Sequence, residues 1–380
     1  MRKFGFLSPE ALQLVQSFYT SGTTQLQILE GRRGQVAKRT ISITKDEERT
    51  TLSKPDFVSR VHQICKSRRV ISSCGYNFEI AEVNSSKPDT TVHVSTYNSS
   101  IRSSPGNLAL LALEDLRHVV YVSSLGRGGT SRLHESERRR FAATSSLLVD
   151  EKGAIDPLPV STALCDALQG EGIQASSVRS DSSGRILASA LGGCLPRGDL
   201  RFIFHNSPSN IGNSNPTFLV ARLLIDNYLR LRIAYRDSCD PNCADSKHQT
   251  WAKAISLMHP FNDSNDSSYP SLTAEIANYR GLTRKCLSPL RGSAVRDLLA
   301  VIERHPHANC GLVLGGLDPL SSGVDLAFLG SCLQRLSDLG TGWIRAAILP
   351  GIRHNSNAAY PGLFCRLEEF LISPGTLPAS

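Results

Sequence analysis

The feature that most constrains the fold of this 380-residue chain is a long polar stretch, residues 237–270. It contains clusters of Asp, Asn, Ser and Pro, notably at residues 261–270, and only one short apolar segment, residues 251–258. A segment of this composition has little apolar surface to bury, which is typical of a connection between domains. A chain of this length can also form two separate cores. We therefore expect a domain boundary within this stretch.

Apolar residues at helical spacing predict helices along much of the chain. The clearest is residues 218–235, where apolar residues such as Leu224, Tyr228 and Leu231 recur close to the helical period. At the N-terminus, Ser8 is a suitable helix cap and Pro9 suits the first helical position. That pattern predicts a helix from residue 9 to about residue 19, and further helices are expected at residues 108–116, 134–148, 161–168, 271–285, 293–304, 324–339, 343–349 and 361–372.

Short strands are expected only in the first third of the chain. Residues 40–44, 91–95 and 119–122 alternate or cluster β-branched side chains, as strands do. Spacers rich in Ser, Asn and Pro separate them. The sequence thus predicts a mainly α protein with minor β elements in the N-terminal half.

The chain is basic, with a formal net charge of +8 and a pI near 9.0. Basic surfaces attract polyanions, and the planar guanidinium of arginine suits phosphate especially well. The excess is nevertheless mild for a chain of this length. The charge is therefore compatible with RNA binding and does not require it.

A glycine-rich turn, residues 125–130, follows an expected strand and precedes a helical stretch. Turns in this setting can hold phosphate on backbone N–H groups. However, Ser131 stands where the dinucleotide pattern has its last glycine, and the sequence contains no Gly-Lys-Ser/Thr. A flexible turn carrying Arg127 is the preferred interpretation. The basic cluster after it is interleaved with Glu135 and Glu137, so an ordinary solvated helix face is the alternative.

Catalytic and metal-binding patterns are not evident in the sequence. We find neither Gly-x-Ser-x-Gly nor His-Glu-x-x-His. Cys239 and Cys243 form a single pair near His248, and no second pair of that kind follows. Adjacent acidic residues such as Glu368 and Glu369 are interpreted as solvated helix positions. We therefore expect no enzyme activity, no catalytic residues, no metal and no cofactor.

The last forty residues contain the most specific pattern. An expected helix ends at Gly340, a short one follows, and then come Pro350-Gly351-Ile352-Arg353-His354 and, after a polar spacer, Tyr360-Pro361-Gly362-Leu363-Phe364. In order and approximate spacing this resembles the C-terminal lobe of nucleoproteins from non-segmented negative-strand RNA viruses, closest to the bornavirus and mymonavirus type. The resemblance covers roughly residues 325–370.

The resemblance implies a mainly α, two-lobed nucleoprotein-like fold that encapsidates single-stranded RNA without sequence specificity. It would comprise an N-terminal arm (1–22), an N-terminal lobe (23–240), a helical C-terminal lobe (241–364) and a C-terminal arm or tail (365–380). Self-association would give rings or a helical polymer. The residues expected to bind RNA are Arg127, Arg132, Arg138, Arg139, Arg140, Arg230, Arg232, Arg353, His354 and Tyr360.

The same resemblance implies a location in the virion or host cytoplasm, the nucleus included as an option, with a viral polymerase and a phosphoprotein-like cofactor as further partners. No membrane is expected, because no apolar run reaches the ~18–20 residues that span a bilayer. Two alternatives remain open. One is a capsid or other structural assembly protein without an RNA groove, and the other is a cytosolic enzyme that uses the Gly126–Gly129 turn for phosphate.

Overall fold

The computed structural model describes residues 23–44, 55–95, 101, 110–123, 130, 158–195, 200–205, 298, 301–315, 326–340, 342–349 and 361–372. Ten strands are β1 (Thr23–Arg32), β2 (Gln35–Thr44), β3 (Arg69–Ser73), β4 (Tyr76–Val83), β5 (Thr90–Val94), β6 (His118–Val122), β7 (Ser177–Asp181), β8 (Arg201–His205), β9 (Asn309–Gly315) and β10 (Ile344–Leu349). The helical elements with bounds are α3 (Pro55–Lys66), α6 (Leu158–Gly170), η1 (Ser182–Gly184), α7 (Arg185–Cys194), α12 (Leu326–Asp338) and α13 (Pro361–Ile372).

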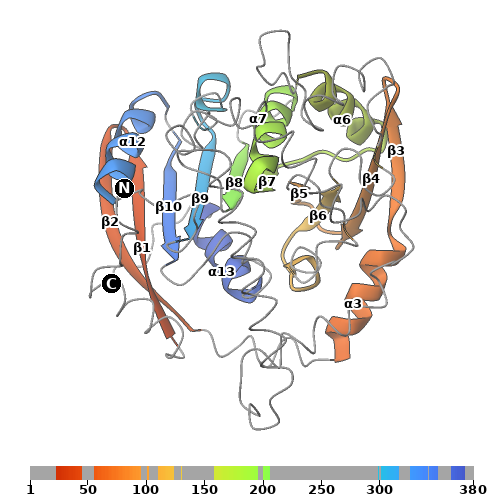
Figure 1. Cartoon of the computed structure of the whole chain (residues 1–380), viewed down its shortest axis with the longest axis horizontal. Coiled ribbons are helices and arrows are strands. Elements are labelled where there is room, and N and C mark those ends of the chain that lie inside the picture. The colour runs from red at the N-terminus through yellow and green to blue at the C-terminus, as the bar shows by residue number, and fades with distance from the viewer. Residues whose placement is uncertain are drawn as a thin grey trace, which may run out of the picture.

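All ten strands form one sheet, in the order β2-β1-β10-β9-β8-β7-β5-β6-β4-β3 (Figure 1). The six strands from β10 to β6 in that order are parallel to one another. An antiparallel hairpin closes each end, β1–β2 beside β10 and β3–β4 beside β6. Parallel strands must be joined by crossovers, usually helices, and α6 and α7 lie between successive strands in this way.

The expected fold class, mainly α, is therefore wrong. Residues 343–349 were expected to form a helix, but residues 344–349 are strand β10 and pair in parallel with β9. A short apolar run looks alike in a buried helix and in a parallel strand covered on both faces, and pairing with β9 decides the outcome here. The strands at 40–44, 91–95 and 119–122 and the helices at 161–168, 324–339 and 361–372 are confirmed to within a few residues.

Both terminal hairpins turn through two residues with positive φ. Arg33 and Gly34 connect β1 to β2 with φ of 48° and 72°, and Cys74 and Gly75 connect β3 to β4 with φ of 51° and 80°. Two-residue turns of this hand match the right-handed twist of the paired strands. The turns therefore fix the register of each hairpin.

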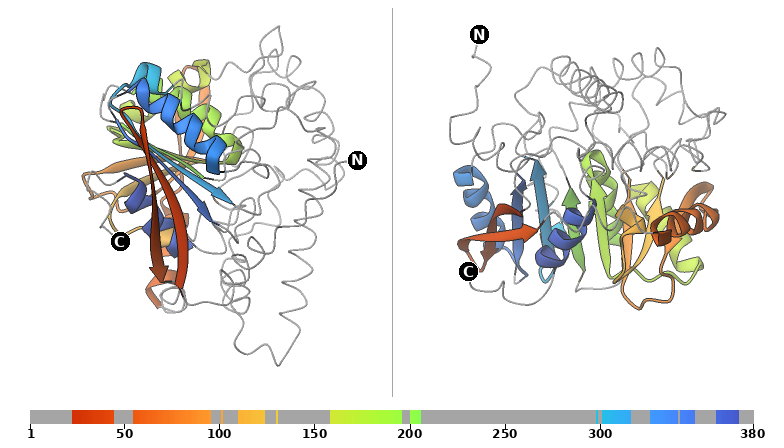
Figure 2. Two further views of the ribbon diagram at one scale, coloured as in Figure 1. Left: turned by 90° about the vertical axis from the view of Figure 1, so that its left-hand side faces the viewer. Right: turned by 90° about the horizontal axis from the view of Figure 1, so that it is seen from below.

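Helices cover both faces of the sheet, as two views of the ribbon show (Figure 2). On one face Val178 and Phe202 join a large apolar core that α6, α7 and α12 complete. On the other face Val313 and Ala347 pack against Leu367 and Leu371 of α13. A further cluster on that side places α3 against β4 and β6. Because side chains alternate along a strand, each central strand contributes to both layers.

The face toward α13 is less apolar than the opposite one. There β5 presents Thr91 and His93, and β7 presents Ser177, Arg179 and Asp181, all buried. Burial of polar groups is costly unless they are paired. These side chains therefore need partners within the layer, and the site described below is built from those partners.

The expected domain boundary near residue 240 falls among residues 206–297, which lie outside the described residues. The division into arms and lobes therefore stays a prediction. Strands from both sides of that segment nevertheless pair directly, because β8 is adjacent to β9. None of the described helices combines the length and the apolar character needed to cross a membrane.

Two glycines provide a matched test of how tightly this sheet packs. A Cβ on Gly192, in α7, would lie 2.2 Å from the ring of the fully buried Phe202, whereas a Cβ on Gly170, at the end of α6, would have no atom within 4 Å. We expect Gly192→Ala to lower the free energy of unfolding by about 1–3 kcal/mol despite the better helix propensity of alanine. Gly170→Ala should leave it unchanged or raise it slightly. Urea unfolding of both variants measures the difference, and equal stabilities would contradict this packing.

Candidate active site

The strand order changes direction at β5. From β5 the chain passes to β6 on one side and then to β7 on the other, so β5 and β7 are neighbours whose following segments diverge. In open parallel sheets such a switch point creates a crevice beyond the carboxyl ends of the strands, where ligands commonly bind. The residues that follow β7 and β5 are therefore the first place to look for a site.

The chain turns sharply from β7 into α7 at this point. Ser182 directly follows the last residue of β7 and has a φ of 48°, in the left-handed region that non-glycine residues rarely adopt. Such a conformation costs about 1–3 kcal/mol and tends to occur where function requires it. Ser182 is only 6% exposed. A serine on a strained strand-to-helix turn is the arrangement called the nucleophile elbow in α/β-hydrolase enzymes.

Gly184 is what allows this turn to fit. A Cβ at Gly184 would lie 2.6 Å from the carbonyl oxygen of Ser95 and 2.7 Å from that of Val94, at the end of β5. No side chain can occupy that space, because both neighbours are backbone atoms. The elbow therefore rests directly on the end of β5. The lack of space for a side chain explains why residue 184, two residues after Ser182, is glycine.

The motif is Ser180-Asp181-Ser182-Ser183-Gly184, with serine in place of the first glycine of Gly-x-Ser-x-Gly. The chain therefore does not match Gly-x-Ser-x-Gly, and Ser182 was not predicted from the sequence. Ser180 is fully buried and small. The signal that could have found it is a serine followed two residues later by glycine, between a strand and a helix.

Helix α7 begins directly after this turn. The positive end of a helix dipole and the first backbone N–H groups favour negative charge close to Ser182. Arg185, the first residue of α7, is 1% exposed, and burial lowers its pKa to about 10. The region around the elbow is therefore electropositive and largely closed to water.

Asp181, the last residue of β7, lies between two histidines. Its Oδ2 is 3.0 Å from Nε2 of His93 on β5, and its Oδ1 is 3.3 Å from Nδ1 of His205 on β8. The contact with His93 is a hydrogen bond, whereas the contact with His205 has ion-pair distance without hydrogen-bond geometry. All three side chains are buried.

The hydrogen bonds assign the protonation of His93. Nε of Arg179 donates to Nδ1 of His93 at 2.7 Å, so Nδ1 is the acceptor and the ring proton lies on Nε2, which donates to Asp181. Burial, together with the positive charge of Arg179, lowers the pKa of His93. His93 is therefore a neutral imidazole with both nitrogens occupied.

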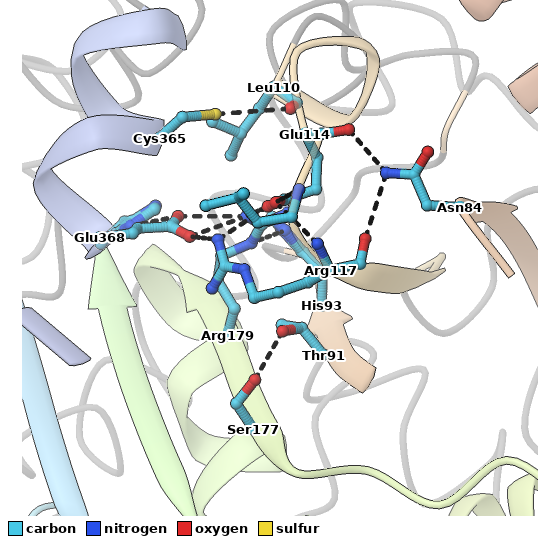
Figure 3. Close-up of polar contacts among 12 residues, drawn as sticks. Asn84, Thr91, His93, Leu110, Glu114, Arg117, Ser177, Arg179, Cys365 and Glu368 are labelled. Atoms are coloured by element: carbon cyan, nitrogen blue, oxygen red, sulfur yellow. Dashed lines mark hydrogen bonds and ion pairs between the residues drawn. The ribbon is translucent and has the colours of Figure 1, made fainter. Parts of the chain in front are cut away.

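Glu368 of α13 is a second buried carboxylate in contact with these residues (Figure 3). It accepts hydrogen bonds from Arg179 at 3.0 and 3.1 Å and from Arg117 at 2.7 Å, and Oε1 lies 3.0 Å from Nε2 of His205. Arg117 also donates to Glu114 at 2.7 Å. We refer to His93, Asp181, His205, Arg179, Glu368, Arg117 and Glu114 as the buried ionic network.

The buried ionic network carries no net charge when its carboxylates are ionised and His205 is protonated. Burial alone would raise the pKa of Asp181 and of Glu368, but the pKa of Asp181 is lowered by His93 and His205 and that of Glu368 by Arg179 and Arg117. Burial likewise opposes a charged His205, yet Asp181 and Glu368 outweigh it and raise the pKa of His205. Three carboxylates face two guanidinium groups, and an imidazolium at His205 balances the remaining negative charge.

Glu368 corrects an expectation from the sequence. It was interpreted as a solvated helix position together with Glu369, but its side chain is fully buried, whereas Glu369 is exposed. Every residue expected to bind RNA, from Arg127 to Tyr360, lies outside the described residues. Among the residues that the structure describes, no group of three or more His, Cys, Asp or Glu side chains is arranged to hold a metal ion.

Comparisons with known proteins find similarity in structure alone. No protein-family model and no curated protein matches the sequence. An α/β hydrolase fold protein from Chitinophaga pinensis is 13% identical with a TM-score of 0.49, covering 80% of this chain and 97% of that one. An esterase from Pyrococcus furiosus is 12% identical with a TM-score of 0.47 (80% and 88% covered), and an epoxide hydrolase from Bacillus megaterium is 11% identical with a TM-score of 0.46 (80% and 99% covered).

The nucleoprotein interpretation is wrong, as are the single-stranded RNA, polymer, polymerase and phosphoprotein partners that followed from it. The segment that carried the resemblance includes β10, a strand inside a ten-stranded sheet, and not a helix of an α-helical lobe. A virion location is not supported either. The expectation that the chain is not an enzyme is also wrong, because Ser182 has the strand-to-helix turn and positive φ that are typical of a nucleophile elbow. Of the alternatives, an enzyme fits the structure best, whereas the Gly126–Gly129 turn expected to hold phosphate lies outside the described residues.

The buried ionic network predicts how stability depends on pH. Because folding raises the pKa of His205, its contribution is complete below about pH 6.5, the ordinary histidine value, and is lost as pH rises through the folded pKa. Because folding lowers the pKa of Asp181 and Glu368, their contribution is present above about pH 4 and is lost on acidification. We expect the free energy of unfolding to fall on both sides, and His205→Asn to flatten the alkaline side. Unfolding measured from pH 3 to 10 tests this, and an unchanged alkaline side in His205→Asn would contradict it.

Proposed function

We propose that this protein is a serine hydrolase that transfers an acyl group from an ester or related substrate to water, with Ser182 as nucleophile. The observation that carries the proposal is the left-handed conformation of Ser182 between β7 and α7, held by the contact of Gly184 with the end of β5. Strain of this kind is retained where the nucleophile's Oγ must lie beside backbone N–H donors.

The proposed reaction has two steps. Oγ of Ser182 attacks the substrate carbonyl carbon while a base takes its proton, and the alcohol leaves with that proton to give an acyl-enzyme. Water, deprotonated by the same base, then attacks the acyl carbon and releases the acid and the serine. In both steps a negative oxygen forms and requires fixed hydrogen-bond donors.

Two features of the described residues bear on that oxygen. The backbone N–H of Ser183 is the donor that an elbow normally supplies, and Ser183 belongs to η1, directly before α7. The N–H of Ser95 already donates to the carbonyl of Val122 at 3.2 Å. A second donor is therefore expected from the chain that follows Ser95.

The base is not taken from the buried ionic network. Both nitrogens of His93 are occupied, and those of His205 face Asp181 and Glu368. In enzymes with this elbow, the acid and the histidine follow the serine in that order along the chain. Asp318 comes three residues after the end of β9, and His354 comes five residues after the end of β10. Both lie outside the described residues, so we propose them from their order in the sequence.

Replacement of Ser182 tests the nucleophile. A fluorophosphonate reagent should form an Oγ–P bond at Ser182, with loss of fluoride and transfer of the hydroxyl proton to the base. We expect Ser182→Ala to abolish both this labelling and the hydrolysis of p-nitrophenyl esters. Ser183→Ala is the matched control, since it retains the backbone N–H and should be labelled. Mass spectrometry of the adduct peptide measures the result, and labelling that persists in Ser182→Ala would refute the assignment.

The base is tested separately. We expect His354→Asn to lower kcat for p-nitrophenyl ester hydrolysis on the order of 10³- to 10⁴-fold, with little change in the thermal unfolding midpoint, because proton transfer and not packing is lost. His307→Asn is the control, since that histidine is exposed. Comparable activity of His354→Asn and the wild type would show that another residue is the base.

A further inference from the structure

Helix α13 reaches the elbow through a short series of buried contacts. Oε1 of Glu368 lies 3.0 Å from Nε2 of His205, and Nδ1 of His205 lies 3.3 Å from Oδ1 of Asp181. Asp181 is the residue immediately before Ser182. The series links α13, β8 and β7, which are distant in sequence, and it ends one peptide bond from the proposed nucleophile.

The carboxylate of Asp181 is also held through its other oxygen, Oδ2. Nε2 of His93 donates to Oδ2 of Asp181, and His93 is itself held by Arg179, which donates to Glu368. The contacts therefore close into a ring of Glu368, His205, Asp181, His93 and Arg179. A side chain held on both oxygens cannot rotate without breaking a contact with a buried partner, which is costly.

Stability alone does not account for this arrangement. Buried ion pairs lose much of their attraction to desolvation, and apolar residues of similar volume often stabilise a protein equally well or better. The neighbouring part of α13 shows that this layer can be apolar, since Leu363, Leu367 and Leu371 are fully buried there. The polar residues are concentrated next to Asp181.

We propose that Glu368 is a positioning residue for Ser182, acting through His205 and Asp181 to hold the end of β7 in the conformation that the elbow needs. The inference rests on the proposed function, because it assigns a role relative to that nucleophile. It predicts that a change on α13 alters the rate of acylation without touching the substrate.

The charge state of His205 is part of this device. The groups that face it are Asp181 from β7 and Glu368 from α13, with the ring of Phe364 from α13 at 5.1 Å and, beyond them, His93 and Arg179. When His205 loses its proton, two buried carboxylates face a neutral ring. The link to Asp181 then weakens, so acylation of Ser182 should decline on the alkaline side.

The test is the rate of fluorophosphonate labelling of Ser182 from pH 5 to 10, in the full-length protein, normalised to the folded fraction from circular dichroism. We expect Glu368→Gln to label at least tenfold more slowly at pH 7 and to show its alkaline decline at lower pH, because His205 loses one of two facing carboxylates. Glu368→Asp should recover part of the rate. The neighbouring Glu369→Gln, whose side chain is exposed, should match the wild type.

The outcomes separate the two proposals. Absence of labelling at Ser182 in the wild type overturns the proposed function. Wild-type labelling together with a folded Glu368→Gln of unchanged rate and pH profile overturns the positioning role alone. If Glu368→Gln does not fold, His205→Asn decides: loss of the alkaline decline supports the role, and a wild-type profile overturns it.

Discussion

The close contact between Gly184 and the end of β5 is the constraint on which the site depends. Two backbone carbonyls, of Val94 and Ser95, occupy the space that any side chain at residue 184 would need. This contact lets the chain leave β7, turn through Ser182 with a φ of 48° and enter α7 within three residues. The parallel pairing of β5 with β7 brings the two segments together, so the elbow is a consequence of the strand order.

The layer between the sheet and α13 is polar next to the elbow because β7, the strand that leads into the elbow, presents charged side chains there. β7 carries Arg179 and Asp181 toward α13, and both are buried in the middle of the sheet. Such a strand is tolerated because Glu368 and the two histidines supply partners with matching charge. Neutrality requires a proton on His205, which ties the position of the elbow to pH. A structural element and the proposed chemistry thus share one set of side chains.

Several regular elements could be predicted from the sequence, whereas most strands of the sheet and the turn at Ser182 could not. The periodicity of residues 361–372 and the β-branched residues at 119–122 indicated a helix and a strand, both confirmed. Residues 344–349 form a short apolar run whose state depends on pairing with β9, which no local pattern reveals. β7 was missed because its polar residues do not look like a buried strand, and Ser182 because Ser180 replaces the expected glycine.

The proposed chemistry depends on Ser182 acting as a nucleophile from a left-handed turn directly before α7. A crystal structure of the protein after reaction with a fluorophosphonate tests it most directly. We expect phosphorus bonded to Oγ of Ser182, a positive φ at that residue, and a phosphoryl oxygen accepting a hydrogen bond from the N–H of Ser183. Phosphorus bonded to a different residue, or a right-handed Ser182 whose adduct points away from α7, would contradict it.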